Sequence, residues 1–126
     1  MPFNFVKFTD PDSSFAARIT VRQTGQLGFN AGAINRYKIN DFAFCVLFFD
    51  EEQKVIGLQL VNEQTEGAIE IKKSESNTFV RGKSFCDRYG IDYSESHRFE
   101  LKREEKENGL LYFELGKELT KEQATD

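Results

Sequence analysis

Residues 17–30 read ARITVRQTGQLGFN, and this stretch decides the fold. Apolar and polar side chains alternate over residues 17–22, a period of two that is typical of a half-buried strand with Arg18 and Arg22 on its outer side. Residues 24–26 predict a turn and residues 27–29 a second short strand. Asn30 follows, a residue type favoured at the start of a helix because its side chain accepts a hydrogen bond from an otherwise unpaired backbone N–H group.

Outward from this stretch, the pattern predicts a two-turn helix over residues 31–37 and a hairpin of two strands. The first strand of the hairpin, residues 42–49, is apolar at almost every position, so we expect it to be covered on both sides, either inside the domain or at a subunit contact. It is the strongest candidate for the core. Residues 50–54 predict the turn, and Ile56, Leu58 and Leu60 alternate with polar or small residues as the returning strand.

The same order of elements recurs 52 residues later in the chain. Ala17, Ile19, Leu27, Tyr37 and Ile39 correspond at this offset to Ile69, Ile71, Phe79, Tyr89 and Ile91. An internal repeat of this kind decides the architecture. We therefore expect an α+β fold, mostly antiparallel, in which two strand-strand-helix-strand-strand repeats form one barrel-like domain.

The repeats set the expected boundaries within the chain. Residues 1–14 form an aromatic arm and a turn, residues 15–116 a single duplicated domain (repeats 15–62 and 67–116), and residues 117–126 a polar, mobile tail. The arm carries Phe3, Phe5 and Phe8. Exposed aromatic side chains usually mark a contact site, so these three are candidate partner-binding residues, unless they cap the barrel instead.

Residues 20–30, the short helix ending in Tyr37-Lys38-Ile39 and the hairpin with an acidic turn resemble the AbrB/MazE swapped-hairpin family. The resemblance covers residues 17–61 and, less closely, residues 68–115, where Tyr89-Gly90-Ile91 is the nearest piece. It implies an interlaced barrel that binds double-stranded DNA through a basic face made of the first strand, its turn and the helix. Gln26 stands where the family often has arginine, and Asn30 replaces a proline that starts the helix.

We expect a small non-enzymatic DNA-binding regulator of transcription, in which basic side chains neutralise phosphates. The candidate DNA-binding residues are Arg18, Arg22, Arg36, Lys38, Arg81, Lys83 and Arg88. The alternative is a protein-interaction or assembly module, antitoxin-like or phage-related, that keeps the fold without binding DNA. The two-sided apolar strand also permits a homodimer.

The composition of the chain also bears on which classes of function remain open. The net charge of −4 gives no overall basic field that favours nucleic acid, so any DNA contact depends on a local face. The longest apolar run is too short to span a membrane, and the first residues lack a signal pattern, so we expect a cytoplasmic protein. Cys45 and Cys86 are expected to be buried thiols rather than metal ligands, and the single histidine, His97, a surface residue. We expect no cofactor, metal or catalytic residues.

Overall fold

The structure is a computed structural model that describes residues 16–74, 77–104 and 110–119. It is an α+β fold dominated by antiparallel strands, as the sequence predicts. In chain order the elements are β1 (Arg18–Val21), β2 (Gln26–Phe29), α1 (Ala31–Tyr37), η1 (Ile39–Asp41), β3 (Phe44–Asp50), β4 (Val55–Val61), β5 (Ala68–Lys73), β6 (Thr78–Arg81), α2 (Lys83–Tyr89), β7 (His97–Glu100), β8 (Lys102–Arg103), β9 (Leu111–Glu114) and η2 (Leu115–Lys117). None of these helices is long and apolar enough to cross a membrane.

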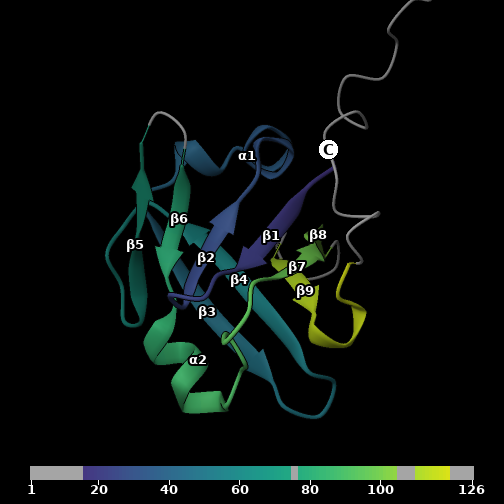
Figure 1. Ribbon diagram of the computed structural model, residues 1–126. Helices are drawn as coiled ribbons and strands as arrows, with labels where there is room; N and C mark the ends of the chain where they lie inside the picture. The colour runs from purple at the N-terminus through teal and green to yellow at the C-terminus, as the bar shows by residue number, and fades with distance from the viewer. Residues whose placement is uncertain (1–15, 75–76, 105–109, 120–126) are drawn as a thin grey trace, which may run out of the picture.

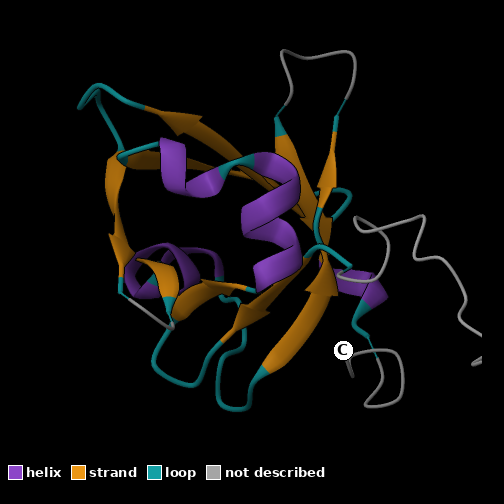
Figure 2. Cartoon of the chain, turned by 90° about the horizontal axis from the view of Figure 1, so that it is seen from above, coloured by secondary structure: helices purple, strands orange, loops and turns teal. Residues whose placement is uncertain are grey.

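The strands form a nearly closed, barrel-like sheet in the order β7-β1-β2-β6-β5-β3-β4-β9-β8 (Figures 1 and 2). The two ends of this order are consecutive in the chain, because only Leu101 separates β7 from β8. β7 pairs with β1, and β8 pairs with β9. Residues 97–103 therefore join the two ends of the sheet, and Figure 1 places α1 and α2 at opposite ends of the barrel.

The elements from β1 to α1 form locally as their sequence predicts. Ile19 and Val21 are buried, while Arg18 and Thr20 between them are half-exposed. The predicted bounds of α1 and the capping role of Asn30 are confirmed, since the Asn30 side chain accepts a hydrogen bond of 2.8 Å from the Ala33 backbone N–H. Gly25 in the turn before β2 has φ of +84°, a conformation that favours glycine.

The core is supplied chiefly by β1, β2, β4 and β9 rather than by β3. Ile19, Leu27, Ile56 and Phe113 are fully buried, whereas Cys45 is the one residue of β3 that is. The expectation that residues 42–49 are covered on both sides inside the domain is wrong: Phe48 on the outer side of β3 is 45% exposed. A barrel has one interior, and no described segment forms a second layer over the outer side of this strand.

The expected equivalence of Leu27 and Phe79 is also wrong. Leu27 lies opposite Val80 in the β2–β6 pair, and both point into the core. Phe79 lies opposite Gly28 and is half-buried on the outer side of the barrel. Because successive side chains of a strand point to opposite faces, a register difference of one residue moves Phe79 from the interior to the surface.

Candidate nucleic-acid interface

Three adjacent strands, β1, β2 and β6, carry the largest group of predicted DNA-binding residues on their outer side. Arg18 and Arg22 alternate with the buried Ile19 and Val21, and Arg81 follows the buried Val80. The pairing β1–β2–β6 places the three arginines on one surface of the barrel. The neighbouring strands β5 and β7 extend this surface. We call it the basic strand face; its charged members are Arg18, Arg22, Glu70, Lys72, Arg81, Arg98 and Glu100.

Arg22 is held in place across the middle of the basic strand face. Its guanidinium donates hydrogen bonds to the side-chain oxygens of Gln26, at 3.2 Å, and Asn77, at 2.8 Å. It also lies 5.7 Å from the centre of the Phe79 ring, within the range of a cation–π interaction. These contacts orient the planar, permanently charged group before any ligand arrives.

Gly28 makes this position of Arg22 possible. A Cβ atom at residue 28 would lie 2.2 Å from a terminal nitrogen of the Arg22 guanidinium, so any larger residue would displace the side chain. The missing side chain of Gly28 thus creates the space that the arginine fills. Gly28 therefore serves the close packing of Arg22 against the strand.

The charge on the basic strand face is partly balanced. Glu70 forms an ion pair of 2.8 Å with Lys72, and this hydrogen bond is the main reason that the pKa of Glu70 lies below its usual value, with a smaller contribution from Arg81. Glu100 lies opposite Arg18 in the β1–β7 pair. Five basic residues therefore outnumber two acidic ones on this face, although the whole chain carries a net charge of −4.

The remaining predicted DNA-binding residues are not members of the basic strand face, and only Lys83 lies at its edge. Arg36 is in the last turn of α1 and Lys38 ends that helix, at the opposite end of the barrel from α2 (Figure 1). Lys83 begins α2 beside the turn at Gly25 and forms an ion pair of 3.0 Å with Asp87, which raises the pKa of Lys83. Arg88 is in the last turn of α2.

Sequence reasoning missed Arg98, which the β1–β7 pairing places opposite Thr20. The alternation of Arg98 and Glu100 with the buried Phe99 and Leu101 was the available signal, because it predicts an outward position for the charged residues. Local pattern does not reveal that β7 lies beside β1. The candidate partner residues Phe3, Phe5 and Phe8 lie outside the described residues.

The cysteines and the histidine serve packing and ion pairing. Burial raises the pKa of the Cys45 thiol to about 12 and that of Cys86 to about 11. His97 lies between two carboxylates: its Nδ1 is 2.8 Å from Glu118 Oε2 and its Nε2 is 3.6 Å from Asp92 Oδ2. The pKa of His97 is raised, chiefly by the hydrogen bond with Glu118. Within the described ranges, no group of three or more His, Cys, Asp and Glu residues could hold a metal ion.

Comparison of the chain with protein-family models, with curated proteins and with solved structures finds no match. The resemblance to the AbrB/MazE family stays a prediction that rests on the residues quoted for it.

Proposed function

We propose that this chain is a small non-enzymatic DNA-binding regulator of the swapped-hairpin type, working in the cytoplasm. The observation that carries the proposal is the clustering of Arg18, Arg22 and Arg81 on the outer side of β1, β2 and β6. Phosphate contacts supply most of the affinity of a protein for DNA, so a local excess of oriented arginines is the feature that such a protein requires.

The pattern of strand pairing supports the proposed two-repeat barrel. The order β1, β2, α1, β3, β4 in the first half matches the order β5, β6, α2, β7–β8, β9 in the second. The first strand of each half pairs with the third strand of the other half, as β1 with β7 and β5 with β3. The corresponding strands β2 and β6 pair with each other, as do β4 and β9. This exchange of partners is the interlacing that a swapped hairpin requires.

The β2–β6 pair gives the proposed interface contributions from both halves of the chain. Arg22, at the end of β1, comes from the first half and Arg81, on β6, from the second, and β2 lies between their two strands. In this interface the arginines contact phosphates, while Thr20 and Gln26 supply neutral hydrogen-bonding groups between them. Arg36 and Lys38, at the far end of α1, are left out of the central contact.

A salt series with purified full-length protein and duplex DNA tests the proposal. We expect affinity to fall steeply as salt rises, with a slope of log affinity against log salt of about −0.9 for each phosphate contacted. Arg22→Gln and Arg81→Gln should each make this slope shallower by about 0.9. Arg103→Gln is the matched control, because Arg103 is an arginine that stacks 5.0 Å from the Tyr37 ring, outside the basic strand face.

Two results would contradict the proposal. Absence of binding at low salt would exclude DNA as the partner. An unchanged salt dependence in Arg22→Gln and Arg81→Gln would show that other residues contact the phosphates. The alternative function, a protein-interaction or assembly module, is favoured by a separate observation, the exposed apolar outer side of β3.

A further inference from the structure

The outer side of β3 differs from that of its counterpart in the second half of the chain. β3 carries Phe44, Val46 and Phe48 outward, and Phe48 is 45% exposed. In the strands β7 and β8, by contrast, the outward residues are Arg98, Glu100 and Lys102. Charged residues occupy the outward positions of β7 and β8, and these strands still form part of the sheet. Folding therefore does not require apolar residues at the outward positions of β3. Exposed apolar surface of this kind usually marks a contact.

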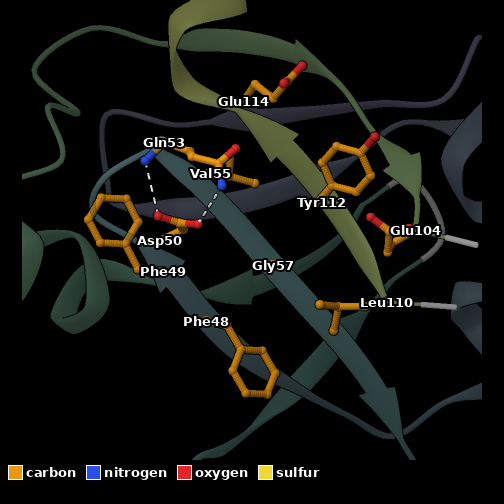
Figure 3. A pocket seen from close by; sticks show the side chains of 10 residues that line it. All are labelled: Phe48, Phe49, Asp50, Gln53, Val55, Gly57, Glu104, Leu110, Tyr112 and Glu114. Carbon is orange, nitrogen blue, oxygen red and sulfur yellow. Dashed lines mark hydrogen bonds between the residues drawn. The ribbon is translucent and has the colours of Figure 1, made fainter. Parts of the chain in front are cut away.

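A groove of about 570 Å³ lies against this row, over β3, β4 and β9 (Figure 3). Gly57 forms its floor, where a Cβ atom would lie 3.2 Å from Leu110 Cδ2 and 3.5 Å from Phe48 Cβ. Phe48 stands on one side of Gly57, and Leu110 and Tyr112 stand on the other (Figure 3). Gly57 itself is buried beneath its neighbours, so the apolar surface offered to the flat ring of an incoming phenylalanine is that of Phe48, Leu110 and Tyr112.

The rim of the groove is acidic. Asp50, Glu104 and Glu114 all line it (Figure 3). Two lysines contact Glu114, Lys102 at 3.3 Å and Lys117 at 3.2 Å, whereas the Asp50 carboxylate accepts hydrogen bonds from the neutral Gln53. A fitting occupant therefore combines aromatic side chains with positive charge. A second copy of the groove, docked face to face, would bring the same carboxylates together.

We infer that the aromatic arm of the same chain, residues 1–8, occupies this groove. Residues 1–8 contain Phe3, Phe5, Val6 and Phe8, and their one charged side chain is Lys7. This composition matches the apolar floor and the acidic rim. The inference goes beyond the proposed DNA contact, because β3, β4 and β9 lie on the other side of the barrel from β2 and β6.

The attachment point of the arm is close enough for this contact. The Ala17 carbonyl accepts a hydrogen bond of 3.0 Å from the Leu101 backbone N–H, and the next residue, Lys102, lies opposite Tyr112 in the β8–β9 pair. Ala17 is thus about 10 Å, or two strand spacings, from the edge of the groove. Residues 9–15 can span about 23 Å when extended, which is more than enough.

Paramagnetic broadening in the full-length protein tests this inference. A spin label is attached at Asn4→Cys; Cys45 and Cys86 are buried and stay unlabelled, because the thiol pKa values of about 12 and about 11 leave little reactive thiolate. We expect the amide signals of Gly57 and Tyr112 to be weaker with the paramagnetic label than after the label is reduced. Amide signals on the basic strand face should keep theirs.

A variant of the groove and a matched control separate docking from a general effect. Phe48→Lys removes an exposed aromatic contact and adds a repelling charge, and it should restore the lost signals. Gln59→Lys, two residues beyond Gly57 and also exposed on β4, adds the same charge without lining the groove and should leave the broadening unchanged.

Three results would overturn the inference: no loss of signal with the label in place, a loss that persists in Phe48→Lys, or a loss that arises between chains. The last is measured by mixing isotope-labelled chains that lack the spin label with spin-labelled chains at natural abundance. Broadening in that mixture would assign the groove to the arm of a second copy.

Discussion

Tyr37→Phe tests the contact that supports closure of the barrel. The Tyr37 hydroxyl, at the end of α1, donates a buried hydrogen bond of 2.9 Å to the Leu101 carbonyl. Leu101 is the residue at which the chain changes partner from β1 to β9. Its backbone N–H in turn donates to Ala17. The substitution removes one oxygen atom and leaves the ring, including its stacking with Arg103, in place.

The expected cost follows from the burial of the acceptor. Leu101 is 1% exposed, so its carbonyl has no ready access to water once the hydroxyl is gone. Leaving a buried acceptor without this partner lowers the free energy of unfolding by about 1–2 kcal/mol. With an m-value of about 2 kcal/mol per molar urea, the midpoint of urea denaturation falls by about 0.5–1 M.

The assay compares urea denaturation of the wild type, Tyr37→Phe and Tyr89→Phe. Tyr89 is the matched control, because its side chain is 36% exposed and water can replace any contact of its hydroxyl. The reasoning is refuted if Tyr37→Phe and Tyr89→Phe shift the midpoint equally. Faster amide exchange at Leu101 in Tyr37→Phe would locate the loss at the seam of the barrel.

Two further predictions concern His97, the first residue of β7, and Asn30, the N-cap of α1. His97 is expected to stabilise the fold while protonated, because its folded pKa is raised by Glu118: the contribution is fully present below the unfolded value of about 6.5 and is lost as pH rises through the folded pKa. The midpoint of urea denaturation of the wild type should therefore fall as pH rises through this range, and the fall should be smaller in His97→Gln. An equal fall in the wild type and in His97→Gln would exclude the ion pair as its cause. Asn30→Ala should lower the free energy of unfolding by about 1–2 kcal/mol, since its Oδ1 accepts from the backbone N–H groups of Ala33 and Arg18 at 2.8 and 2.9 Å. Asn30→Asp keeps both acceptor contacts and should recover most of that loss by thermal denaturation; no recovery would mean that the amide donor to Ala16 dominates.

The features predicted well from the sequence are those that a few neighbouring residues determine. Alternation fixed the inward positions of Ile19 and Val21, and the hydrogen-bonding chemistry of Asn30 placed the start of α1. Strand register is harder to predict from the sequence, because the length of a turn decides which face of the sheet each side chain lies on. That is why Phe79 was expected in the core and lies on the surface.

The basic strand face was only partly predictable, for a reason of topology. Arg18 and Arg22 share one strand, so their common side follows from the sequence. The placement of Arg81 and Arg98 beside them depends on the β2–β6 and β1–β7 pairs, which join residues 49 to 82 positions apart. Arg36 and Lys38 are predicted to join them because the family resemblance implies a basic face that includes the helix, whereas α1 places them at the end of the barrel.

For the apolar strand 42–49 the sequence leaves two alternatives open, cover inside the domain or at a subunit contact, because an apolar pattern does not say what covers each side; the structure excludes the first. Within β3 the inward side packs as expected, and the outward side is left at the surface. The two outer faces of the barrel therefore differ in composition. The face of β2 and β6 is rich in arginine, and the face of β4 and β9 is apolar with an acidic rim. Sites that share no residues behave independently. Phe48→Lys should accordingly leave the salt dependence of DNA binding unchanged, and Arg22→Gln should leave the broadening of Gly57 unchanged. If either substitution altered both measurements, the arm and the DNA contact would be coupled, and the division of the barrel into two independent faces would fail.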